Sequence, residues 1–162
     1  MPAPSGYSRI QIRLHWIIAF LIVLQFVLHE PIAKAWDAIE AGQEFTFSLL
    51  IPLHVFGGLL ILALAAWRIS VRAKRGAPAL PEKEPAPLKI AAHITHFALY
   101  AMMVLMPVSG AVAWFGGQEG AADAHEAMKA LLLLFFFLHV AGALFQQFVL
   151  KTNIMDRMKR PD

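Results

Sequence analysis

The histidines of this 162-residue chain are the residues best suited to chemistry. All seven lie in or beside apolar stretches: His15, His29, His54, His93, His96, His125 and His139. A polar side chain inside an apolar span is costly, so such residues are usually functional. A hydrogen-bonding strut between helices would explain any one of these rings. Seven in one short chain indicate a shared role in metal or proton chemistry.

The spacing of two of these histidines predicts what that role is. His125 and His139 lie fourteen residues apart in an otherwise apolar segment. Fourteen residues of α-helix rise about 21 Å and bring the second residue to within about 40° of the same face. Two b-type haems at two depths of a helix bundle, each with two axial imidazoles, need such an arrangement.

The opposing axial ligands must come from other helices. His15 lies near the start of the first apolar run, and His54 lies toward the opposite end of the second. Matching these depths with those on the last helix pairs His54 with His125 on an outer haem iron. The same argument pairs His15 with His139 on an inner haem iron.

His29 competes with His54 for the role of outer ligand, because it also lies fourteen residues from His15. It stands beside Glu30-Pro31, where the first helix should end. His54 is followed by V-F-G-G, whose glycines would let a flat macrocycle approach the backbone. We therefore favour His54.

A second group of histidines and arginines is expected at the inner end of the predicted spans. His93 and His96 are three residues apart and share one face of a helix. They are candidates for contacts with haem propionates or for a quinone site, and one of them could instead replace His139 as a ligand. Arg13 and Arg68 are further candidates for holding propionates or the quinone.

Four long apolar runs must position these residues. The chain is 59% hydrophobic and 15% charged, whereas soluble domains are about 45–50% apolar and about 25% charged. The runs lie near 10–29, 47–69, 91–115 and 127–150, and each has roughly the 20 residues that cross a bilayer as a helix. We expect one all-α domain over 1–162, an integral membrane four-helix bundle.

Local signals refine these bounds. Ser8 is a predicted N-cap of the first helix, and a short helix is expected near 33–41. The Pro-rich stretch 77–87 is predicted to be an extended linker, and Pro107 to kink the third span. Asp123 with Glu126 fits a capping box at the start of the fourth span.

Charge predicts the orientation. Twelve of the fourteen Lys and Arg residues fall in the two termini and the second connection, while the other two connections hold two bases and seven acids. This asymmetry predicts a multi-pass membrane protein with both termini cytoplasmic. Because the bases flank apolar spans, nucleic-acid binding is not expected. The chain has no cysteine, which excludes iron–sulfur clusters, thiolate metal sites and covalently attached haem.

The ordered motifs resemble those of the bacterial cytochrome b561 family along nearly the whole chain. They are Y-S-R-I-Q-I-R-L-H-W (7–16), L-H-V-F-G-G (53–58), A-H-I-T-H-F-A-L-Y (92–100), P-V-S-G (107–110), H-E with L-H (125–126, 138–139) and K-T-N-I-M-D-R-M (151–158). The resemblance implies two non-covalent b haems. It also implies ligands at His15, His54, His125 and His139, and leaves His93 and His96 as non-ligands.

The resemblance also implies electron transfer between the outer face and the quinone pool. One branch of the family resembles a superoxide:quinone oxidoreductase, so the expected reaction is oxidation of superoxide and reduction of ubiquinone. The alternative is a non-catalytic subunit that serves a periplasmic redox protein. A histidine-lined metal permease is a remote alternative, because the spans hold no mid-membrane carboxylate.

Overall fold

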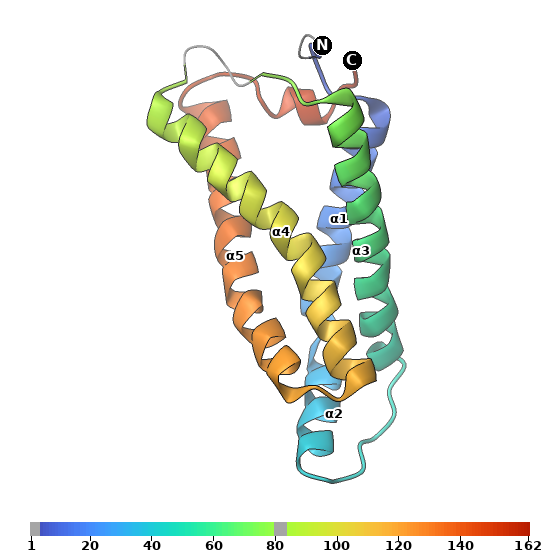
Figure 1. Ribbon diagram of the computed structural model, residues 1–162. Coiled ribbons are helices and arrows are strands. Elements are labelled where there is room, and N and C mark those ends of the chain that lie inside the picture. Colours follow the sequence, from blue (N-terminus) through green and yellow to red (C-terminus); the bar gives the residue numbers. More distant parts are fainter. Residues whose placement is uncertain (1–3, 80–83) are drawn as a thin grey trace.

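The structure is a computed structural model that describes residues 4–79 and 84–162. Within these residues it is all-helical and holds no strand (Figure 1). The elements are α1 (Arg9–Val27), α2 (Glu30–Glu40), α3 (Leu50–Arg75), α4 (Ala86–Gly116), α5 (Glu119–Phe148) and a 3₁₀ turn, η1 (Asp156–Met158). Four of the helices, α1, α3, α4 and α5, are long and apolar enough to cross a membrane. The prediction of an all-α protein with four spans is confirmed.

The beginning of α1 follows the predicted cap. Ser8 Oγ accepts a hydrogen bond from Gln11 N at 3.3 Å, and Gln11 Oε1 accepts one from Ser8 N at 3.0 Å. This reciprocal pair satisfies two backbone donors that the first turn leaves free. At the other end, Pro31 lies in the first turn of α2, where the missing N–H costs nothing.

The predicted capping box of the last span is wrong. Asp123 and Glu126 lie inside α5, which begins at Glu119 and follows Gln118 without a side-chain cap. Gly117 takes a left-handed conformation with φ 61° and ends α4. Because glycine adopts this conformation without strain, α4 turns back into α5 within a few residues.

The Pro-rich linker is also shorter than predicted. The helix α4 begins at Ala86 with Pro87 in its first turn, so the last two residues of the predicted linker are helical. The middle of that stretch, 80–83, lies outside the described residues. The same helix continues through Pro107 to Gly116.

The long helices pack in the order α1, α3, α4, α5, with α2 against α3. Both termini lie at one end of the bundle, called here the termini end, and α2 lies at the other, the α2 end (Figure 1). Large apolar side chains point outward, including Val27, Phe97 and Phe148 at 70% exposure or more. A surface this apolar suits lipid rather than water, so the chain is a multi-pass membrane protein.

Candidate cofactor sites

Two pairs of imidazoles face each other across the bundle. His54 on α3 and His125 on α5 have ring centroids 6.4 Å apart, and His15 on α1 and His139 on α5 have centroids 6.0 Å apart. An imidazole nitrogen binds a transition metal at about 2.0–2.1 Å, so rings on opposite sides of one ion have centroids about 6.4 Å apart. Each pair therefore has the spacing of two axial ligands of one iron.

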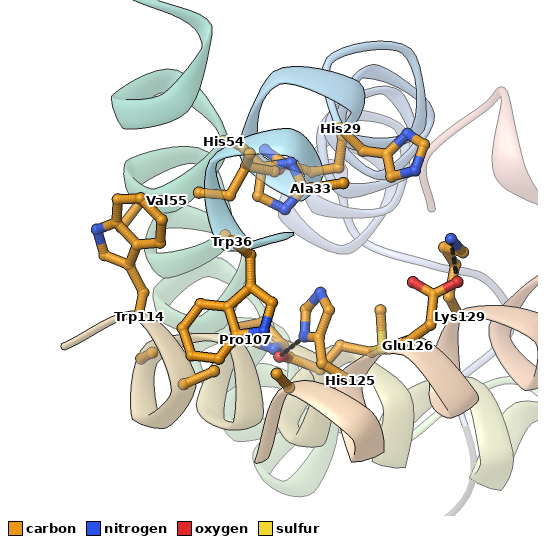
Figure 2. Close-up of a pocket in the computed structure, with 18 of the residues that line it drawn as sticks. His29, Ala33, Trp36, His54, Val55, Pro107, Trp114, His125, Glu126 and Lys129 are labelled. Atoms are coloured by element: carbon orange, nitrogen blue, oxygen red, sulfur yellow. Dashed lines mark hydrogen bonds and ion pairs between the residues drawn. The ribbon is translucent and has the colours of Figure 1, made fainter. Parts of the chain in front are cut away.

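The pair at the α2 end borders a cavity of about 500 Å³, a volume in the usual range for small-molecule sites. His54 and His125 point toward each other across it (Figure 2). Gly58, Pro107 and Gly110 also line it. A Cβ added at Gly58 would meet no atom within 4 Å, so this glycine leaves the open face that a flat macrocycle requires.

The backbone of α4 orients His125. Its Nδ1–H donates to the carbonyl of Met106 at 2.9 Å, and the hydroxyl of Ser109 lies 3.2 Å from the same nitrogen. The ring also lies against Gly110, where a Cβ would come within 3.0 Å of His125 Cε1. A proton held at Nδ1 leaves Nε2 free to bind a metal, which is the arrangement of a metal-ligating histidine.

His29 lines the same cavity but has a different orientation. Its ring is turned away from His125, whereas the ring of His54 faces it (Figure 2). The geometry thus favours His54 over His29, and the identity of the ligand remains a prediction.

At the termini end, His139 has two neighbouring rings. His15 lies 6.0 Å away and His96 lies 5.2 Å away. The shorter separation leaves too little room for an iron between opposed imidazoles, so the geometry favours His15. The Nδ1–H of His96 donates to the carbonyl of Ala92 at 2.7 Å. His93 is exposed, so the two histidines of α4 have different surroundings.

Arg68 reaches from α3 to α1 beside this second pair. Its Nη1 donates to the carbonyl of Gln11 at 2.8 Å, and its Nη2 lies 3.4 Å from Nδ1 of His15. Since a guanidinium only donates hydrogen bonds, Nδ1 of His15 accepts here. His15 thus differs from His125, whose Nδ1 donates.

A second guanidinium joins Arg68. The Cζ atoms of Arg68 and Arg72 lie 5.7 and 5.5 Å from the ring centre of Tyr100 on α4. Two neighbouring guanidiniums form a natural site for carboxylates such as propionates. Arg13 is exposed on α1. Sequence reasoning missed the aromatic support from Tyr100, although this residue ends one of the quoted motifs.

Four spans with two facing pairs of imidazoles are the arrangement expected of a membrane-bound cytochrome b. Residues 6–161 match the model of the prokaryotic cytochrome b561 family. The chain belongs to this family, and membership implies haem b as the cofactor.

Curated relatives of nearly equal length agree with this assignment. A protein named cytochrome b562 from Cereibacter sphaeroides is 38% identical and aligns over 99% of both chains. A protein named probable superoxide oxidase CybB from Yersinia pestis is 28% identical over 94% of each chain. A protein named cytochrome b561 homolog 1 from Escherichia coli is 24% identical over 95% of this chain and 97% of its own.

Proposed function

We propose that residues 1–162 form a single di-haem domain of the bacterial inner membrane that oxidises superoxide and reduces ubiquinone. The observation that supports it most is the two imidazole pairs at two depths, with separations of 6.4 and 6.0 Å. His54 with His125 would hold one haem, and His15 with His139 the other. When bound, each b haem supplies a one-electron carrier.

Other residues of the chain prepare these sites. The Met106 carbonyl keeps the proton of His125 at Nδ1. Arg68 and Arg72 would take the carboxylates of the cofactor at the termini end. Ligation through Nε2 of His15 needs a proton at its Nδ1, so the long contact with Arg68 must be released as the guanidinium turns to a carboxylate.

The overall reaction balances without an added reductant. Two superoxide ions release two electrons and become two molecules of oxygen, and one quinone takes up two electrons and two protons to give the quinol. The α2 end would face the periplasm, where superoxide arrives, and the termini end the cytoplasm. His96, half-buried beside His139, and the exposed His93 are the candidate proton carriers or quinone contacts there.

The charged residues at the α2 end indicate which kind of electron donor this end would attract. Lys129 lines the cavity together with four carboxylates, those of Asp37, Glu40, Asp123 and Glu126, and its Nζ lies 2.5 Å from Glu126. Lys34 is exposed and pairs with Glu30 at 2.8 Å, and this hydrogen bond lowers the pKa of Glu30 and raises the pKa of Lys34. A carboxylate-rich mouth repels an anion.

This acidic mouth favours a second candidate function, electron transfer from a basic periplasmic protein. The name of the relative from Yersinia pestis supports superoxide instead. Both functions use the same ligands, so the first experiment tests the ligands and the second tests the donor.

The first experiment is the reduced-minus-oxidised spectrum of the purified protein with haem counted per chain. We expect two b haems in the parent, one in His54→Ala and His139→Ala, and two in His29→Ala and His96→Ala. A colourless parent would refute the cytochrome function and favour the permease. Loss of haem in His29→Ala or His96→Ala would reassign a ligand.

In the second experiment, superoxide is generated in the presence of purified protein and ubiquinone, and the loss of superoxide and the formation of quinol are measured. Faster loss of superoxide with formation of quinol supports the superoxide reaction. No change in the loss of superoxide would leave the protein-donor function.

A further inference from the structure

Gln25 is a polar residue of α1 that the haem ligands leave unexplained. Its side chain lines the cavity at the α2 end together with His54. Its Oε1 is buried and, among the described residues, has no hydrogen-bond partner, and the same is true of Nδ1 of His54. An unpaired polar atom in an apolar span costs free energy. One unpaired acceptor and one unpaired ring nitrogen therefore share a cavity.

The neighbouring helix has a gap that fits the Gln25 side chain. A Cβ added at Gly57 would lie 2.1 Å from Gln25 Nε2, so no larger residue fits at 57 while the amide stays in place. Gly57 is three residues after His54 and thus lies on the same side of α3. Gly58, by contrast, borders open space. The two adjacent glycines therefore have different roles. Gly57 makes room for the Gln25 amide, and Gly58 leaves space in the cavity.

We propose that Gln25 is a positioning residue for the haem at the α2 end, with its Oε1 accepting the Nδ1–H of His54. The inference rests on the proposed ligand pair of this site. It gives His54 the same kind of partner that His125 has in the Met106 carbonyl at 2.9 Å. A ligating histidine almost always donates its second ring N–H to such an acceptor, which fixes the ring and raises its basicity.

The hydrogen bond has a consequence for the reduction potential. A more basic imidazole donates more charge to iron and stabilises the ferric state, so the Gln25 amide lowers the midpoint potential of this haem. The backbone carbonyl of Gln25 is a competing acceptor, because it lies within hydrogen-bond reach of the His54 ring. A substitution that removes only the side chain distinguishes the two acceptors.

The test is a redox titration of the holoprotein that resolves both haems, with the one lost in His54→Ala assigned to the α2 end. Gln25→Leu should raise the midpoint of that haem and leave the other unchanged. Gln25→Glu, which keeps an acceptor oxygen, should restore a low midpoint. Gln147→Leu is the matched control, because Gln147 lies on α5 near the termini end, where its Oε1 accepts from Met155 N.

A second variant tests the gap at Gly57. Gly57→Ala should raise the same midpoint by displacing the amide, and it should add nothing in a Gln25→Ala background, where the long side chain is gone. An effect of Gly57→Ala that persists in that background would mean that Gly57 serves another contact, and would overturn the proposal.

Two further outcomes would also overturn the proposal. An unchanged midpoint in Gln25→Leu would mean that the His54 ring donates to the backbone carbonyl and not to the side chain. A shift in the midpoint of the other haem would mean that Gln25 acts on the haem at the termini end. These readouts do not depend on the electron donor. A failed superoxide reaction with a shifted midpoint would therefore refute the proposed reaction and leave the role of Gln25 standing.

Discussion

At the scale of single residues, the imidazole of His125 is held by the backbone of a neighbouring helix. The carbonyl of Met106 takes its Nδ1–H, and Gly110 gives the ring a place against α4. Both contacts come from the P-V-S-G stretch and the residue just before it. A change in this stretch should therefore act on the cofactor at the α2 end without touching a ligand.

We expect Gly110→Ala to halve the haem content per chain. The added Cβ would come to 3.0 Å from His125 Cε1, and a ring that moves away from it strains the hydrogen bond to the Met106 carbonyl. Gly120→Ala is the control, because a Cβ there meets nothing within 4 Å. Haem counted against protein by the pyridine haemochrome spectrum measures the effect, and full occupancy in Gly110→Ala would contradict it.

The charges at the mouth of the cavity lead to a prediction about rate. Lys129→Gln should lower the rate constant for superoxide by about two- to tenfold, and Glu126→Gln should raise it, because each change alters the field that an anion meets. Both effects should shrink as salt is added. Lys34→Gln is the matched control, since Lys34 does not line the cavity. Equal rates in all three variants would argue for a protein donor.

The sequence predicted the histidine pairs better than the residues that position their rings. The fourteen-residue spacing places His125 and His139 on one face at two depths, and the structure brings each beside its predicted partner. Gln25 and Gly57 are far apart in the chain and meet only through the packing of α1 on α3. No periodicity reports such a contact, so reasoning from the sequence could not find it.

At the scale of elements, the C-terminal segment 151–162 crosses the termini end and ties the helices together (Figure 1). Thr152 Oγ1 donates to Gln146 Oε1 on α5 at 2.8 Å. Trp16 Nε1 on α1 donates to the carbonyl of Met158 at 2.8 Å. Asp162 pairs with Arg75 at the end of α3 at 3.4 Å. The segment thus contacts three of the four spans.

Gln146 is the buried centre of this connection. Its Nε2 also donates to Glu84, whose side chain is buried just before α4. We expect Gln146→Leu to lower the free energy of unfolding by about 1–3 kcal/mol, because it leaves a buried carboxyl without its donor. Thr152→Val, which removes one hydroxyl, should cost about 1 kcal/mol. Thermal unfolding in detergent, followed by circular dichroism, measures both, and equal stability in the two variants would contradict this order.

Hydropathy located the spans well and their ends less well. The four apolar runs overlap α1, α3, α4 and α5, because every spanning residue needs an apolar side chain toward lipid. The start of α5 depends instead on one glycine, Gly117, whose left-handed backbone lets the helix begin at once. A capping pattern at Asp123 was a weaker signal than this turn.

At the scale of the whole molecule, the two ends of the bundle differ in charge as well as in shape. The α2 end has the cavity with its four carboxylates, and the termini end has Arg68, Arg72 and the basic C-terminal segment. Under the proposed function, this difference in charge would let the two ends attract different partners. The direction of transfer then depends on which end faces the cytoplasm.

The charge asymmetry predicts that the termini end faces the cytoplasm, and the chain suits a direct test because it has no cysteine. Gln43→Cys lies in the exposed connection after α2, and Lys159→Cys lies in the exposed C-terminal segment. A membrane-impermeant maleimide should label Gln43→Cys in spheroplasts and Lys159→Cys only in inverted vesicles. The reverse pattern would place the cavity and its two facing imidazoles in the cytoplasm. Periplasmic superoxide could not then be the donor, even if every ligand were assigned correctly.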